Sequence, residues 1–160
     1  MKFEQRLQRA INRGVDRSDD KARKERDEKI SEEEFRRLHS EHRLQLGEHI
    51  EQCIQKLSSH FPGFRYETIY GDKGWGAACY RDDVDVGRRG RDNFYSRLEM
   101  TICPLSSVHV LDLAGKATIR NKEVFKRNHF EALTNVDTDQ FIEFVDVWVL
   151  EYAELYAARS

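Results

Sequence analysis

The feature that most constrains the fold is a change in the spacing of apolar residues at Phe64. From Phe64 to Ile119 apolar and polar side chains alternate, whereas the flanking segments repeat apolar residues every three to four positions. Alternation places every second side chain on one face of a β-strand, and a period near 3.6 forms the apolar stripe of a helix. The sequence therefore predicts an α+β domain in which an N-terminal helix, an antiparallel sheet of four to five strands and a C-terminal helix follow one another, with the helices packed on one sheet face.

Two hairpins account for most of the predicted sheet. The first, FRYETIYGDKGWGAACY, is expected to turn at Asp72 and Lys73, which lie between two glycines. The second, YSRLEMTICPLSSVHVLDLAGKATI, is expected to turn within residues 104–107. Residues 84–93 are predicted to be a long loop between the hairpins, and residues 118–130 to extend the sheet or form its edge.

The apolar pattern of the second hairpin suggests a register. If Met100 lies opposite Leu111, the large apolar side chains of both strands gather on one face and the other face is suited to solvent. The same register places Glu99 opposite Asp112. Two carboxylates opposed across a ladder would share a proton or bind a cation, unless neighbouring cations neutralise them.

The two helices have matching start signals. Ser31 is followed three positions later by Glu34, and Asp137 by Gln140, which is the spacing of a capping box. A Phe-Pro-Gly sequence ends the first helix, and the second is expected to span residues 138–157.

Composition divides the chain into two parts. Residues 16–29 contain no large apolar side chain, so they contribute nothing to a core. We expect residues 1–30 to form a mobile, charged helical arm that is broken near Gly14, and residues 31–160 to form a single domain.

No apolar run is long enough to span a membrane, and no signal-peptide pattern is present. The three cysteines form no CxxC motif, so a reducing cytoplasm is expected.

Charge is unevenly distributed although the formal net charge is only −2. Residues 85–130 carry nine Lys or Arg and five Asp or Glu, whereas residues 131–160 carry one and seven. One interpretation is that residues 87–91 and 120–127 form a basic surface for nucleic acid or a phosphate ligand. The other is that they are a solvated hairpin loop and a charged edge strand that resists aggregation. The basic residues are Arg88, Arg89, Arg91, Arg120, Lys122, Lys126 and Arg127.

The histidines of the first helix do not predict a metal site. His42 and His49 lie seven residues apart, but the sequence contains no HExxH motif, and a metal site needs three or more convergent ligands. We therefore expect no metal, no cofactor and no catalytic residue.

Three stretches, TIRNKEVFKRNHF, FVDVWVLEYAELYAA and LHSEHRLQLGEHIEQC, resemble a family of conserved proteins from planctomycete bacteria. The resemblance spans most of the chain. It implies a bacterial, cytoplasmic protein and carries over no catalytic residue.

The C-terminal helix is the expected partner surface. It has large apolar groups on more than one side, and aromatic side chains are frequent anchors of interfaces. We therefore expect a non-enzymatic interaction or scaffolding module that forms a homodimer or binds a protein partner through this helix. The expected anchors are Trp148, Tyr152 and Tyr156.

Overall fold

The computed structural model describes residues 2–87 and 90–159, with their side chains except at positions 27–30, 85 and 91. The chain forms two compact units, of which the first ends at Arg37 and the second begins at Leu38. The elements in chain order are α1 (Phe3–His60), β1 (Arg65–Ile69), β2 (Trp75–Gly87), β3 (Gly90–Ile102), β4 (Val110–Ile119), β5 (Lys122–Ala132), a 3-10 turn (Leu133–Asn135) and α2 (Thr138–Arg159).

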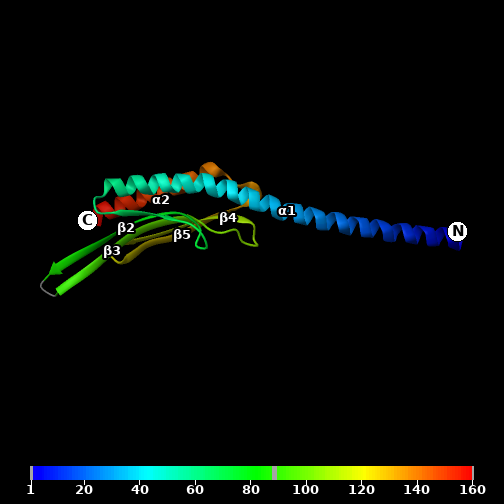
Figure 1. The fold of residues 1–160 in the computed structure, drawn as a ribbon, viewed down its shortest axis with the longest axis horizontal. Helices are drawn as coiled ribbons and strands as arrows, with labels where there is room; N and C mark the ends of the chain where they lie inside the picture. The colour runs from blue at the N-terminus through cyan, green and yellow to red at the C-terminus, as the bar shows by residue number, and fades with distance from the viewer. Residues whose placement is uncertain (1, 88–89, 160) are drawn as a thin grey trace. The chain divides into compact units, whose positions relative to one another are not determined.

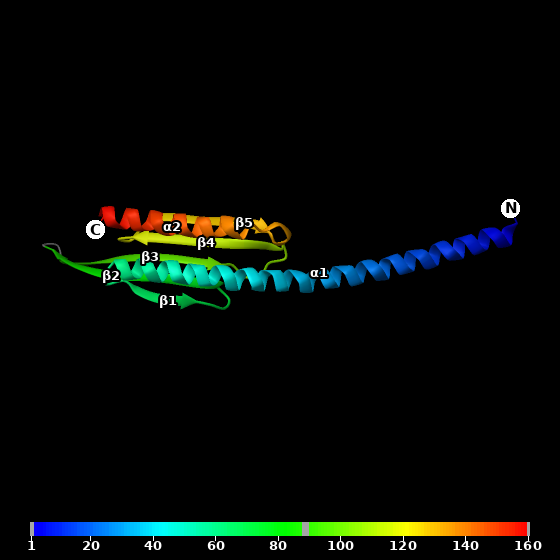
Figure 2. The ribbon, with the colours of Figure 1, turned by 90° about the horizontal axis from the view of Figure 1, so that it is seen from above.

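The second unit is a two-layer α+β domain, as predicted. Its five strands lie in the order β1-β2-β3-β4-β5, and every neighbouring pair is antiparallel. The part of α1 from residue 38 onward and the whole of α2 lie on the same side of this sheet (Figure 1). Seen from above, this part of α1 passes over β2, and α2 passes over β4 and β5 (Figure 2). The other face of the sheet carries no helix among the described residues of this unit.

The core lies between the sheet and the two helices. Each helix contributes a stripe with helical spacing, and β3 and β4 contribute alternate residues, which confirms the faces predicted from the apolar pattern. Burying a leucine or isoleucine side chain completely contributes about 1.5–3 kcal/mol each. The buried residues of this layer include Leu46, Ile50, Ile54, Leu98, Met100, Ile102, Leu111, Leu113, Phe141, Val145 and Tyr152.

The predicted register of the β3–β4 hairpin is wrong by four residues. Met100 pairs with Gly115 rather than with Leu111, so the connection between the strands is longer than predicted. A shift by an even number leaves every side chain on its predicted face, and the apolar pattern therefore did not distinguish the two registers. The observed register places a glycine beneath the indole of Trp148, where a Cβ atom would clash.

α1 begins earlier than predicted and contains no break. Both Gly14 and Ser31 lie inside the helix, so the predicted break and the predicted capping box are wrong. Glu34 bonds to Arg37 in the next turn instead of reaching back toward Ser31. The cap of α2 is confirmed, because the backbone N–H of Gln140 donates to the Asp137 carboxylate over 3.3 Å.

The predicted loop at residues 84–93 is also wrong, because β2 and β3 continue pairing as far as Gly87 and Gly90. The β1 ladder stops at Tyr80 and the β4 ladder stops at Arg97. The two central strands therefore extend beyond the rest of the sheet as a two-stranded ribbon, here called the β2–β3 ribbon (Figure 1).

None of the helices in the described part of the chain is long and apolar enough to cross a membrane.

Candidate functional site

The predicted aromatic anchors of α2 lie in the core instead of on the surface. Trp148, Tyr152 and Tyr156 are 4%, 0% and 6% exposed. The Tyr152 hydroxyl donates to the backbone carbonyl of Thr118 over 3.0 Å, so even its polar end is used within the chain. These aromatics are buried because α2 presents them to the sheet.

The described residues of the predicted basic surface lie in different places. Arg120 lies at the β4–β5 turn with its guanidinium 4.2 Å from the centre of the Phe94 ring. Lys126 is exposed on the open sheet face, whereas its neighbour Arg127 forms an ion pair with Glu151 of α2 on the helix-covered side. Lys122 is exposed at the start of β5. Arg88 and Arg89 lie outside the described residues, as does the side chain of Arg91.

Asn121 joins the β4–β5 turn to β3. Asn121 sits in the β4–β5 turn with a φ of 71°, a conformation that Asn tolerates better than most residues. Its side chain donates to the carbonyl of Asn93 and accepts from the N–H of Tyr95, both over 2.8 Å. Its own N–H donates to the carbonyl of Tyr95, also over 2.8 Å. The β4–β5 turn therefore binds the base of the β2–β3 ribbon.

The uncovered sheet face contains a shallow depression of about 510 Å³, here called the open-face depression. At its centre the small residues Thr101 and Ala114 lie opposite each other on β3 and β4. The charged residues that line it are Glu67, Lys73, Arg97, Glu99, Lys116, Lys126 and Arg127, of which Arg127 is paired with Glu151.

Charge in the open-face depression is only partly balanced. Arg97 contacts both carboxylates, at 2.7 Å from Glu67 and 3.2 Å from Glu99. Burial opposes the charge of Arg97, but hydrogen bonds to Glu67, Tyr95 and Glu99 together raise its pKa, so it stays protonated. Lys116 on β4 lies directly opposite Lys126 on β5, and both are exposed. Like charges opposed across a ladder repel, so this pair favours an added anion.

The predicted pair of carboxylates is not assembled. Glu99 lies opposite Lys116, because the register differs from the predicted one. Asp112 lies opposite Phe130 and accepts a hydrogen bond from Asn128 over 3.0 Å. The two acidic groups therefore do not face each other across the ladder, and the shared-proton hypothesis is wrong.

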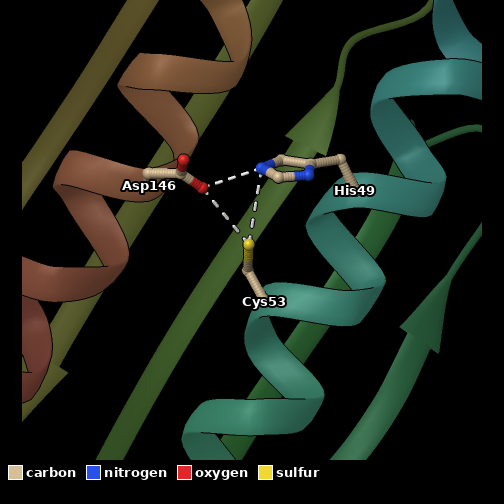
Figure 3. A group of neighbouring side chains, drawn as sticks. All are labelled: His49, Cys53 and Asp146. Carbon is tan, nitrogen blue, oxygen red and sulfur yellow. Dashed lines mark hydrogen bonds and ion pairs between the residues drawn. The ribbon is translucent and has the colours of Figure 1, made fainter.

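A second group of polar side chains lies between the two helices and was not predicted. His49 and Cys53 are one turn apart on α1, and Asp146 reaches toward them from α2 (Figure 3). His49 Nε2 lies 2.7 Å from Asp146 Oδ1, and Cys53 Sγ lies 3.4 Å from the same oxygen and 3.5 Å from His49 Nε2. Burial, reinforced by Asp146, raises the pKa of the Cys53 thiol to about 11. The spacing of His49 and Cys53 was visible in the sequence, but nothing there connected them to Asp146.

Comparison of the chain with family models, with curated proteins and with solved structures finds no match. The resemblance to planctomycete proteins therefore stays a prediction.

Proposed function

We propose that this protein is a non-enzymatic protein-interaction module that binds an acidic segment of a partner protein in the open-face depression. The observation that carries the proposal is the opposition of Lys116 and Lys126 on the uncovered sheet face. Neither lysine has an ion pair within the described part of the chain. A carboxylate placed between them would replace a repulsion with two attractions.

The net charge of the depression supports an acidic occupant. Its lining has five cations, Lys73, Arg97, Lys116, Lys126 and Arg127, and two carboxylates. Because Arg127 is paired with Glu151 of α2, an excess of two positive charges is left. Because Arg97 is already engaged by both carboxylates, the lysines supply the available charge. Complementary charge of this kind increases specificity and the rate of association.

Binding is favoured over catalysis because the acid pair expected at this face is not assembled. Glu99 is held by Arg97, and Asp112 is bonded to Asn128.

A protein partner is favoured over nucleic acid by the composition of the β2–β3 ribbon. Residues 81–92 contain four arginines but also four aspartates, so the ribbon has no net charge. Contacts to phosphates depend on an excess of cations.

The test uses the full-length chain and a short fluorescein-labelled polyglutamate peptide, with binding followed by fluorescence anisotropy. The double variant Lys116→Glu/Lys126→Glu should weaken binding at least about tenfold, or about 1.4 kcal/mol. The control, Lys21→Glu/Lys24→Glu, makes the same charge change in the first unit and should have little effect.

Two results would contradict the proposal. One is peptide binding that both double variants reduce equally. The other is tighter binding of an oligothymidylate that has the same charge as the peptide. If Lys116→Glu/Lys126→Glu also weakens the binding of this oligonucleotide, the result supports the nucleic-acid alternative. Light scattering on the wild type and on Lys116→Glu/Lys126→Glu determines whether the chain forms a dimer that depends on this face.

A further inference from the structure

We propose that His49, Cys53 and Asp146 form a binding site for a single divalent transition-metal ion, with Zn²⁺ the preferred ion, that bridges α1 and α2. The site is separate from the open-face depression, because the helices cover the opposite side of the sheet.

The positions of the three donor atoms fit a tetrahedral ion. For ordinary zinc bond lengths, neighbouring ligand atoms around a tetrahedral Zn²⁺ lie about 3.4–3.6 Å apart. Cys53 Sγ already lies 3.4 Å from Asp146 Oδ1 and 3.5 Å from His49 Nε2. Only the hydrogen-bonded pair His49 and Asp146, at 2.7 Å, has to separate, and a small side-chain rotation is sufficient for this.

The chemistry of the donors selects the ion. A thiolate, an imidazole and one carboxylate match the ligands found around zinc, whereas Mg²⁺ and Ca²⁺ take oxygen ligands. The side chains of His49 and Asp146 are 26% and 46% exposed, so an ion can enter from solvent. Three protein ligands leave a fourth position for water.

The ligands stand on well-supported elements. His49 and Cys53 lie beside Ile50 and Ile54, which are completely buried, and Asp146 follows the completely buried Val145. Two of the ligands share one helix face because they are four residues apart. A site on packed helices keeps its geometry better than a site on loops.

The same three residues do not form a nucleophilic relay. In a Cys-His-Asp relay the two imidazole nitrogens serve different partners, one for the thiol and one for the carboxylate. Here a single atom, His49 Nε2, is within reach of both Cys53 and Asp146.

The test is a Co²⁺ titration of the full-length, tag-free chain after chelator treatment, because Co²⁺ bound to a thiolate has a ligand-to-metal charge-transfer absorption. We expect this absorption to saturate at one equivalent and to disappear when Zn²⁺ displaces Co²⁺. Cys53→Ser should abolish it, and His49→Gln and Asp146→Asn should each weaken Zn²⁺ binding at least about tenfold.

The matched control is Cys103→Ser, because Cys103 is a free cysteine that is also half-buried and has a pKa raised to about 11. This variant should keep the absorption and the affinity. Circular dichroism of each variant verifies that it is folded. The proposal is overturned if the wild-type chain shows no charge-transfer absorption, or if Cys103→Ser removes it while Cys53→Ser does not.

Discussion

The indole of Trp148 lies directly on the backbone of Gly115, so that a Cβ atom at this glycine would be 2.7 Å from Cε3 of the ring. This contact joins α2 to β4. It also explains why the register of the β3–β4 hairpin brings a glycine to this position.

Gly115→Ala should therefore destabilise the domain, because neither the backbone nor the buried indole has room to move. Overpacking of this kind costs about 1–3 kcal/mol, which urea unfolding would measure. Gly47→Ala is the matched control, since nothing lies within 4 Å of its Cβ position on α1. It should increase stability by about 0.5–1 kcal/mol, because alanine favours a helix. Equal effects of both substitutions would contradict the close contact at Gly115.

Substitution of Trp148 by alanine should destabilise the domain much more than substitution of Leu150, because the two side chains lie on the buried and the exposed side of α2. Trp148 is 4% exposed and Leu150 is 66% exposed. Trp148→Ala should lower the free energy of unfolding by about 3–5 kcal/mol, and Leu150→Ala should change it by less than about 0.5 kcal/mol. A Trp148→Ala chain that keeps its stability but dissociates from a dimer would restore the role of this residue as a partner anchor.

Removal of the Asn121 side chain should loosen the base of the β2–β3 ribbon. Asn121→Gly keeps the positive φ but loses both side-chain hydrogen bonds to β3, including the one from the Tyr95 N–H. Amide exchange at Tyr95 should then become faster by about tenfold, which corresponds to the loss of about 1.4 kcal/mol of local protection. Exchange in the distant helix α2 should not change, and general acceleration throughout the domain would show that the turn has a wider role.

Stability should decrease on acidification because of His39. Burial lowers the pKa of this histidine below its ordinary value of 6.5, although its hydrogen bond to the Cys103 carbonyl opposes the effect. Below about pH 6.5 the unfolded chain binds a proton that the folded chain does not, so the free energy of unfolding falls until the folded-state pKa is reached. Arg43 and His42 add to the cost of the charge, and the ring of Trp75 lies against the imidazole.

The measurement for His39 is urea unfolding across the range from neutral to mildly acidic pH, compared between the wild type and His39→Gln. The variant should have a flatter profile, with a difference of at most about 1.4 kcal/mol per pH unit. His60→Gln, at an exposed position, should have the profile of the wild type. Parallel profiles for wild type and His39→Gln would contradict the role of His39.

Much of the fold could be predicted because it depends on local spacing. The alternation after Phe64, the turn at Asp72 and Lys73 and the Asp137 cap each reflect residues close together in the sequence. The errors arose where one local pattern fits two structures. A capping box at Ser31 also fits the interior of a long helix, and an apolar face fits any register shifted by an even number of residues.

The candidate sites were harder to predict because they depend on contacts between distant residues. The burial of Trp148 follows from a glycine on another element, and the opposition of Lys116 and Lys126 follows from a register that the sequence left open. The approach of Asp146 to His49 required the packing of both helices on one sheet face.

The nearest-neighbour order of the five strands has a kinetic consequence. Each strand pairs with the next strand in the chain, so the whole sheet can assemble through short loop closures, which is a fast route. The helices are different, because Asp146 is 97 residues from His49 and 93 residues from Cys53. Docking of α1 beside α2 therefore closes a loop of more than ninety residues and should occur late in folding. The reactivity of Cys53 toward a thiol reagent during refolding would report this step.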